Sequence, residues 1–265
     1  MRKTEVMMTT CENLWQADDH QANRTEELLK KLRLPTARRC FSELHDQAPS
    51  KGWSPMQWLT AILEHEVCER DDRRRTARRK ESGLPPGKTL ETFDFELVKG
   101  VKKMKAQEFA KGDWVEDAHN LLLFGPSGSG KTHLAAAIAY GLIDHGRRVL
   151  YTPTTTMLQR LQAARKEATL PKLFEKLERF DVIILDDIGY ADKRQVDTGL
   201  LFDLIADRYE SRSLIVASNK PFSAWEDVFP DKARCVAAID RLVHYGVTVE
   251  IQGESYRRKK AQERI

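Results

Sequence analysis

Cysteine is scarce in this chain, and long apolar runs are absent. Four cysteines occur among 265 residues, and no two of them form a C-x-x-C pair: Cys11, Cys40, Cys68 and Cys235. Such scatter is typical of reduced thiols in a cytoplasm and argues against a disulfide framework or a zinc motif. No apolar run approaches the roughly 18 residues of a membrane span, and residues 1–14 lack the apolar core of a signal peptide. We therefore expect a cytoplasmic protein with no membrane partner.

Aromatic side chains are also few, at 8% of residues, and neither charge is in large excess. The sequence offers no evident platform for stacking bases, which favours contact with a duplex backbone over capture of a single strand. The formal net charge is only +4, but basic residues gather in three clusters that we consider for DNA contact: Arg73, Arg74, Arg75, Arg78, Arg79 and Lys80; Lys102 and Lys103 within 99–105; and Arg258 and Lys259 within 257–260. Such clusters neutralise phosphates without reading sequence. The alternative is a solvated helix face whose charges pair with Glu69, Asp71 and Asp72.

One stretch, residues 125–132, matches the phosphate-loop pattern G-x-x-x-x-G-K-[ST] at every fixed position. It reads Gly125, Pro126, Ser127, Gly128, Ser129, Gly130, Lys131, Thr132. The apolar run 120–124 before it predicts a buried strand, and the Ala-rich run 133–140 after it predicts a helix. In that setting, backbone N–H groups and the helix N-terminus surround a phosphate. We expect Lys131 to reach the β- and γ-phosphates and Thr132 to bind Mg²⁺, because a flexible Gly/Ser linker would not stand between a strand and a helix.

Two regions of different pattern flank a Pro- and Gly-rich stretch. Residues 24–80 carry helical periodicity with a break at Leu34-Pro35, and Ser54-Pro55 marks a helix start that we expect to continue into the basic run. The stretch 83–87, Gly-Leu-Pro-Pro-Gly, cannot continue a helix. We therefore divide the chain into an N-terminal helical domain with a basic tail (1–82), a linker segment (83–97) and an ATPase domain (98–265).

Strands and helices alternate beyond residue 98. We expect a helix over 98–109, strands at 120–124, 148–151, 182–185, 214–217 and 247–251, and helices at 131–145, 154–165, 170–179, 195–209 and 231–244. Gly146 fits the C-terminal cap of the helix expected at 131–145. The alternation predicts an α/β fold in which a parallel sheet carries helices on both faces.

Acidic and amide side chains follow two of the predicted strands. Asp186 and Asp187 end the apolar run 182–185, and ligands bind at that carboxyl edge in open α/β sheets. With a phosphate loop present, we expect Asp186 to hold Mg²⁺ and Asp187 to polarise the water that attacks the γ-phosphate. Asn219, after the run 214–217, is placed to hold that water from the other side. The alternatives are that Asp187 caps the next segment and that Asn219 is a turn residue.

Together these residues resemble the AAA+ ATPases of the initiator and helicase-loader clade. They resemble most closely the IstB-type helper ATPases of bacterial insertion sequences, which are relatives of the helicase loader DnaC. The resemblance covers residues 24–260 and adds to the phosphate loop four further runs in a specific order: 83–95, 185–189 (Leu-Asp-Asp-Ile-Gly), 239–242 (Ile-Asp-Arg-Leu) and 251–257 (Ile-Gln-Gly-Glu-Ser-Tyr-Arg).

The resemblance implies a five-stranded sheet of order 5-1-4-3-2, with ATP bound between neighbouring subunits. It also implies that His133 belongs to the nucleotide site together with the loop, and that an arginine from the neighbouring subunit completes it. Arg241 matches that arginine best and Arg234 is the runner-up, although either could be a surface ion-pair residue. Arg257 matches a nucleotide-sensing arginine. Two departures argue against fast turnover: Asp187 stands where most such proteins carry Glu, and about 14 residues follow the last strand, so we expect no substantial C-terminal lid.

The resemblance thus implies an ATP-dependent DNA-binding ATPase that forms homo-oligomers on duplex target DNA and recruits or activates a cognate transposase. Two other functions remain open at this point. A replicative helicase loader would use the same ATPase with a protein client, and a small-molecule kinase would use the phosphate loop without needing basic clusters.

Overall fold

The computed structural model of the protein describes residues 19–190, 199–227, 229 and 232–252. The chain divides into two compact units, Met1–Thr76 and Ala77–Ile265. Helix α4 (Pro55–Ser82) continues into the basic run, as expected, and contributes to both units. The boundary at Thr76 precedes the expected one after residue 82, because the last turns of α4 already bond to the second unit. There Arg79 pairs with Asp144 and Arg148 pairs with Glu81. Among the described residues, no helix combines the length and apolarity of a membrane-spanning segment.

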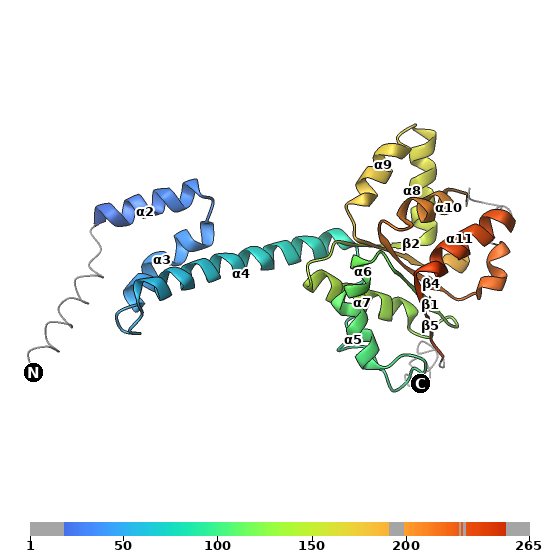
Figure 1. The fold of residues 1–265 in the computed structure, drawn as a ribbon, viewed down its shortest axis with the longest axis horizontal. Coiled ribbons are helices and arrows are strands. Elements are labelled where there is room, and N and C mark those ends of the chain that lie inside the picture. Colours follow the sequence, from blue (N-terminus) through green and yellow to red (C-terminus); the bar gives the residue numbers. More distant parts are fainter. Residues whose placement is uncertain (1–18, 191–198, 228, 230–231, 253–265) are drawn as a thin grey trace, which may run out of the picture. The chain divides into compact units, whose positions relative to one another are not determined.

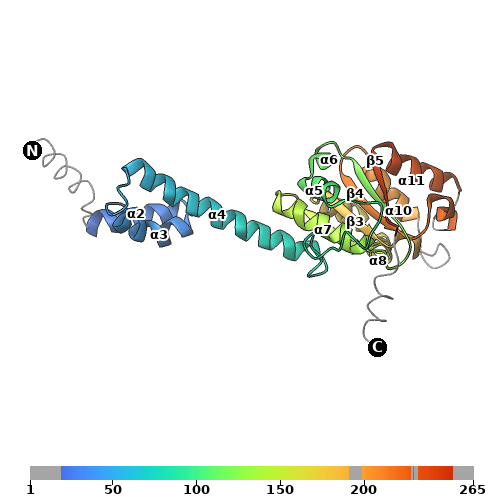
Figure 2. The same cartoon turned by 90° about the horizontal axis from the view of Figure 1, so that it is seen from below.

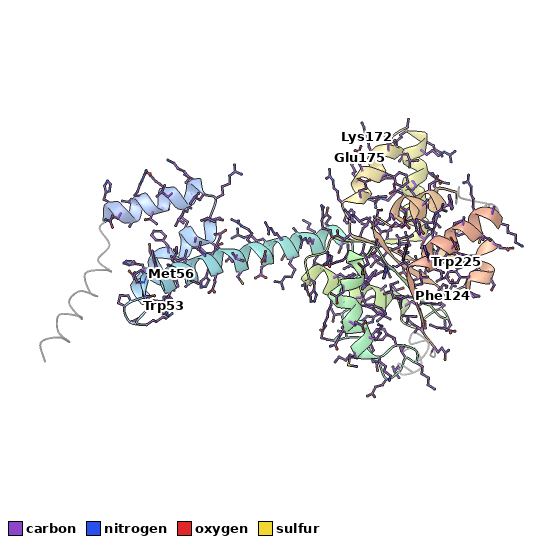
Figure 3. The ribbon with its side chains drawn as sticks, in the orientation of Figure 1. Trp53, Met56, Phe124, Lys172, Glu175 and Trp225 are labelled. Carbon is purple, nitrogen blue, oxygen red and sulfur yellow. The ribbon has the colours of Figure 1, made fainter. Side chains whose placement is uncertain are left out.

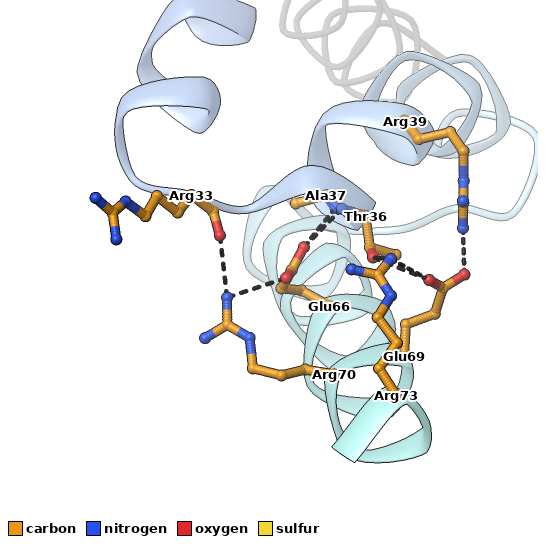
Figure 4. A network of polar contacts seen from close by, with 8 residues as sticks. All are labelled: Arg33, Thr36, Ala37, Arg39, Glu66, Glu69, Arg70 and Arg73. Atoms are coloured by element: carbon orange, nitrogen blue, oxygen red, sulfur yellow. Dashed lines mark hydrogen bonds and ion pairs between the residues drawn. The ribbon is translucent and has the colours of Figure 1, made fainter. Parts of the chain in front are cut away.

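The first unit contains α2 (Asp19–Lys31), α3 (Pro35–Gln47) and most of α4. Its small core is formed by Ala37, Leu44 and Ile62. Helix α3 begins with Pro35 and has Leu34 at its N-cap, which has no side-chain acceptor for the first N–H groups. Figure 4 shows how α4 supplies that acceptor, Glu66.

The Glu66 carboxylate is 3% exposed and caps α3 from outside the helix. Its Oε2 accepts from the backbone N–H groups of Thr36 at 2.8 Å and Ala37 at 3.0 Å. Arg70 donates to its other oxygen at 3.1 Å. Burial alone would raise the pKa of Glu66, but these hydrogen bonds lower it, so the carboxylate stays ionised at the positive end of the helix.

The second unit is built on five parallel strands, which Figures 1 and 2 show from two sides. They are β1 (Asn120–Phe124), β2 (Val149–Pro153), β3 (Val182–Asp186), β4 (Ser213–Ser218) and β5 (Gly246–Glu250). Their order across the sheet is β2-β3-β4-β1-β5, which confirms the expected order 5-1-4-3-2. The carboxyl ends of the central strands β1, β3 and β4 are therefore neighbours.

Alternate residues of the strands face two separate cores. On one face, Leu121 and Ile184 pack with α5 (Lys103–Lys111) and α7 (Lys131–Asp144). On the other face, Leu122 and Ile183 pack with α8 (Thr154–Lys166), α9 (Leu170–Glu178), α10 (Gly199–Arg208) and α11 (Lys232–His244). The short helices are α6 (Asp113–Glu116), η2 (Ile188–Tyr190) and η3 (Phe222–Asp227). Helices on both faces of a parallel sheet are the arrangement that the sequence predicted.

The expected helix over 98–109 is wrong for residues 98–102, since α5 begins only at Lys103. Lys99 instead forms an antiparallel bridge with Gln252, with N–H···O distances of 2.7 and 2.8 Å in the two directions. Gly100 has φ +101°, and a Cβ there would lie 1.9 Å from the Glu250 carbonyl oxygen. The close approach of the two backbones requires glycine at position 100. The segment around Lys99 is therefore extended and pairs with the residues after β5.

Candidate nucleotide-binding site

The phosphate loop joins β1 to α7 in a backbone conformation that requires glycine. Gly128 and Gly130 have φ of +83° and +96°, values that side-chain-bearing residues rarely adopt. A Cβ at Gly125 would lie 2.3 Å from the Ile251 carbonyl oxygen, and one at Gly130 would lie 3.1 Å from the Phe93 ring. The loop is thus held between the residue after β5 and the linker segment.

Lys131 is 4% exposed and reaches back over the loop. Its ammonium donates to the carbonyl oxygens of Gly125 at 2.9 Å and Pro126 at 2.8 Å. Ser129 carries a buried hydroxyl oxygen that has no hydrogen-bond partner within the described part of the chain. A buried cation beside an unpaired hydroxyl suits an anionic oxygen ligand such as a phosphate.

The structure brings Thr132 and Asp186 together. The Thr132 hydroxyl donates to Asp186 Oδ1 at 3.1 Å, although the two residues stand 54 positions apart in the chain. Tyr151 donates to the other oxygen, Oδ2, at 2.7 Å, and the Thr154 hydroxyl donates to the Asp186 backbone carbonyl at 2.9 Å. A hydroxyl and a carboxylate oxygen at this spacing fit the oxygen ligands of Mg²⁺ or of its bound water.

Asp187 and Asn219 follow the neighbouring strands β3 and β4. Asp187 is half-buried and has φ +56°, an uncommon backbone conformation that Asp and Asn tolerate better than most residues. The Asn219 side-chain oxygen is buried and has no hydrogen-bond partner among the described atoms. Such an atom fits a ligand or a water molecule, since buried polar groups are normally paired.

Gly189 was named from sequence only as part of the Leu-Asp-Asp-Ile-Gly run, and the structure gives it a spatial reason. A Cβ at this position would lie 2.3 Å from the Asn219 side-chain oxygen. Any larger residue would therefore displace the amide. This close approach joins η2 to the turn after β4, and the two are far apart in sequence. The only sign of it in the sequence is the glycine itself.

An aromatic cluster fixes the turn that carries Asn219. Trp225 is fully buried in η3 and donates from Nε1 to Ser218 Oγ at 3.3 Å and to the Lys220 carbonyl at 3.2 Å. Its ring lies 6.2 Å from that of Phe124, the last residue of β1 (Figure 3). The residues on either side of Asn219 are thus anchored to the strand that leads into the phosphate loop.

His133, expected in the nucleotide site, lies against the linker segment. Its Nε2 is 3.1 Å from the Thr92 hydroxyl and 3.2 Å from the Thr89 carbonyl, and its ring meets Phe93 edge-on at 5.2 Å. Burial lowers the pKa of His133, which favours the neutral ring. The linker segment 83–97 is therefore fastened to the first turn of α7, one residue beyond Thr132.

The two candidate arginines share one aromatic partner. The Arg241 guanidinium lies 4.9 Å and that of Arg234 5.8 Å from the centroid of the Phe202 ring. Arg241 also donates to the Ala237 carbonyl at 3.4 Å. Arg257, Arg258 and Lys259 lie outside the described residues.

Many of the basic side chains considered for DNA contact form ion pairs with acids. Arg73 pairs with Glu69, Arg74 with Asp71 and Arg75 with Asp72, all one turn apart on α4, and Arg79 pairs with Asp144. This pairing matches the alternative of a solvated helix face. Exposed pairs of this kind contribute only about 0–1 kcal/mol, so a phosphate could still displace them. Lys102 and Lys103 lie at the start of α5.

Comparison with known proteins identifies the family. The model of the IstB-like ATP-binding proteins matches residues 27–264. The chain belongs to this family. An insertion sequence ATP-binding protein of Sinorhizobium fredii is 48% identical over 237 residues, which cover 89% of this chain and 80% of that one. The ATP-binding protein of insertion sequence IS21 from Pseudomonas aeruginosa is 37% identical, with 89% of each chain covered. This IstB-like protein is accordingly an ATP-binding protein, as the phosphate loop predicted.

Solved structures confirm the AAA+ fold of this IstB-like protein. The DnaC helicase loader superposes with a TM-score of 0.53 at 18% identity, covering 63% of this chain and 98% of that one. The AMPPCP-bound replication initiator DnaA of Aquifex aeolicus superposes with a TM-score of 0.54 at 22% identity. There the match covers 69% of this chain but only 55% of the initiator chain. At these identities the likeness concerns the fold alone.

Proposed function

We propose that this protein hydrolyses ATP in a Mg²⁺-dependent reaction and uses the cycle to assemble on target DNA and recruit a transposase. The observation that carries the proposal is the contact between Thr132 and Asp186, which joins the phosphate loop to the acidic end of β3. In a member of an ATP-binding family, this pair would supply ligands for the metal ion beside a loop that would hold the triphosphate.

Each polar group of the site has a distinct task in hydrolysis. The Lys131 ammonium would exchange the carbonyls of Gly125 and Pro126 for phosphate oxygens. Thr132 and Asp186 would hold Mg²⁺, which when bound supplies positive charge against the β- and γ-phosphates. Asp187 would accept a hydrogen bond from the attacking water and orient it, and Asn219 would hold the water from the neighbouring strand end.

Support for a role in transposition comes from the relatives, whose names assign them to insertion sequences. A replication initiator of the same fold has been solved with AMPPCP and single-stranded DNA. In this chain the exposed basic side chains of α4 and α5 would make sequence-independent contacts with a duplex. The nucleotide would lie between subunits, with Arg241 contributed by a neighbour, so that ATP binding would join copies along the DNA.

The test of this function is whether duplex DNA stimulates ATP hydrolysis and drives assembly. We expect hydrolysis to rise at least severalfold when duplex DNA is added, and the particle mass to increase only when DNA and a non-hydrolysable ATP analogue are both present. Steady-state phosphate release and light scattering after size exclusion measure the two effects. A rate indifferent to DNA would favour a kinase. Tight ATP-dependent binding to a hexameric helicase, without transposase binding, would indicate a helicase loader.

Replacing Arg241 by Ala should separate nucleotide binding from hydrolysis. If the guanidinium acts on a neighbour's γ-phosphate, the variant should bind ATP normally but hydrolyse it at least 10³-fold more slowly, the order typical of arginine fingers. Equilibrium ATP binding and single-turnover hydrolysis in the presence of DNA measure the two effects. Lys232→Ala, at the start of the same helix and 78% exposed, is the matched control. Normal hydrolysis by a folded Arg241→Ala variant would contradict the assignment, whereas loss of both binding and hydrolysis would point to misfolding instead.

A further inference from the structure

The buried Asp186 carboxylate has a different partner on each oxygen. It is 4% exposed, and Oδ1 accepts from Thr132 while Oδ2 accepts from the Tyr151 phenol at 2.7 Å. The phenol contact is the shorter of the two. Tyr151 comes from β2, which β3 and β4 separate in the sheet from β1, the strand that leads into the phosphate loop, and no motif in the sequence marks it.

The sheet register explains why Tyr151 reaches Asp186. Tyr151 stands opposite Ile184 in the β2–β3 ladder, and Asp186, two residues further along β3, has its side chain on the same face. Tyr151 is half-buried against the core that contains α7, whose first turn carries Lys131 and Thr132. The phenol of β2 and the hydroxyl of Thr132 therefore reach the two oxygens of the same carboxylate.

A second contact, from the start of α8, holds the backbone of Asp186. The hydroxyl of Thr154, fully buried at the start of α8, donates to the Asp186 carbonyl. With its main chain held, the carboxylate can still move by rotation about the two side-chain torsions of Asp186, of which the terminal one is broad in acidic side chains. The hydrogen bond from Tyr151 limits that rotation.

The phenol is a constant donor across ordinary pH. Burial raises the pKa of Tyr151, and the hydrogen bond to Asp186 and the charges of Asp186 and Asp187 raise it further. A phenolate next to two carboxylates is thus disfavoured. In the structure the phenol is the hydrogen-bond donor and Oδ2 of Asp186 the acceptor.

We propose that Tyr151 is a positioning residue for the metal site: by holding Oδ2, it turns Oδ1 of Asp186 toward Thr132, where Mg²⁺ binds with ATP. This inference rests on the proposed function, since that function assigns Thr132 and Asp186 to hold Mg²⁺. Outer-shell partners of metal-binding carboxylates set their orientation, and losing one typically costs about 10–100-fold in metal affinity. Tyr151 should act on the gain in ATP affinity that Mg²⁺ provides and leave the metal-free affinity unchanged.

The test compares ATP affinity with and without the metal in Tyr151→Phe, which removes only the hydroxyl. Dissociation constants are measured by calorimetry in excess EDTA and in saturating Mg²⁺, without DNA, and their ratio gives the Mg²⁺ gain. We expect the variant to reduce this gain about tenfold or more and to match the unaltered protein within twofold in EDTA. Tyr209→Phe is the matched control, because it also removes a hydrogen-bonded phenol oxygen, here 2.6 Å from His244 Nδ1.

A double-mutant cycle distinguishes positioning from a general structural role. Asp186→Asn alone should reduce the Mg²⁺ gain, and adding Tyr151→Phe should reduce it no further, because the phenol acts only through that carboxylate. Additive losses, an unchanged gain in Tyr151→Phe, or an equal fall of both affinities would each overturn the inference. So would an unaltered protein whose ATP affinity does not respond to Mg²⁺. The assay uses binding alone, so failure of DNA-stimulated hydrolysis would reject the proposed function without deciding the role of Tyr151.

Discussion

Asp187→Asn should bind ATP and DNA as the unaltered protein does and hydrolyse ATP about 10³-fold more slowly, within the range that general-base residues contribute. The amide keeps the size of the side chain but lacks the negative charge that polarises the attacking water. Asn also suits the backbone, since Asp187 has φ +56° and Asn is among the residues that adopt this conformation most readily. Single-turnover hydrolysis with DNA measures the rate, and calorimetry measures ATP affinity.

The slow step should also trap the assembly. If hydrolysis releases the subunits, Asp187→Asn with ATP should form the large particles that the unaltered protein forms only with a non-hydrolysable analogue. Asp203→Asn, which neutralises an exposed carboxylate on α10, is the matched control and should behave as the unaltered protein. Normal hydrolysis by Asp187→Asn would show that another group polarises the water and would favour the capping alternative for this residue.

Two of the candidate site residues, Asp186 and Asn219, follow apolar runs whose ends can be recognised in the sequence. The central strands β1, β3 and β4 are almost entirely buried, so their limits appear as abrupt changes from apolar to polar residues, as at Leu185-Asp186. A parallel sheet then brings these ends to one edge. This argument places Thr132 near Asp186, and the structure confirms the proximity at 3.1 Å. The strand order itself followed from family resemblance, because local periodicity does not encode which strands are neighbours.

Contacts between residues that lie far apart in the chain could not be predicted from the sequence. Tyr151 lies within a predicted strand and reads as an ordinary core residue, since its partner stands 35 positions later. The requirement for glycine at position 189 depends on Asn219 in another loop. The extended segment at Lys99 depends on pairing with Gln252 near the far end of the chain. In each case the deciding contact is long-range, and a single sequence carries no record of such contacts.

Lys131→Met should lower ATP affinity at least 100-fold. Lys131 is almost fully buried at the N-terminus of α7. Because little water would surround a triphosphate there, the charge of the ammonium would act on the phosphates with little screening. A loss of 100-fold corresponds to about 2.7 kcal/mol, the size expected for one charge-assisted contact in such a site. Met fills most of the volume of the lysine stem without its charge and is preferable to Ala, which would also leave a cavity. Calorimetric titration with ATP and Mg²⁺ measures the change.

The thermal stability of the Lys131→Met variant shows whether a loss of ATP binding results from the missing charge or from a damaged fold. Lys131→Met removes hydrogen bonds to two carbonyls of the loop, Gly125 and Pro126, but it also relieves a buried cation of its desolvation cost, so the two effects oppose each other. We therefore expect its thermal unfolding to stay within a few degrees of the unaltered protein. Lys172→Met, an exposed lysine on α9 (Figure 3), is the control and should retain full affinity. Micromolar ATP affinity in a folded Lys131→Met variant would contradict the phosphate-loop assignment, because no other buried ammonium lies in the loop that the structure describes.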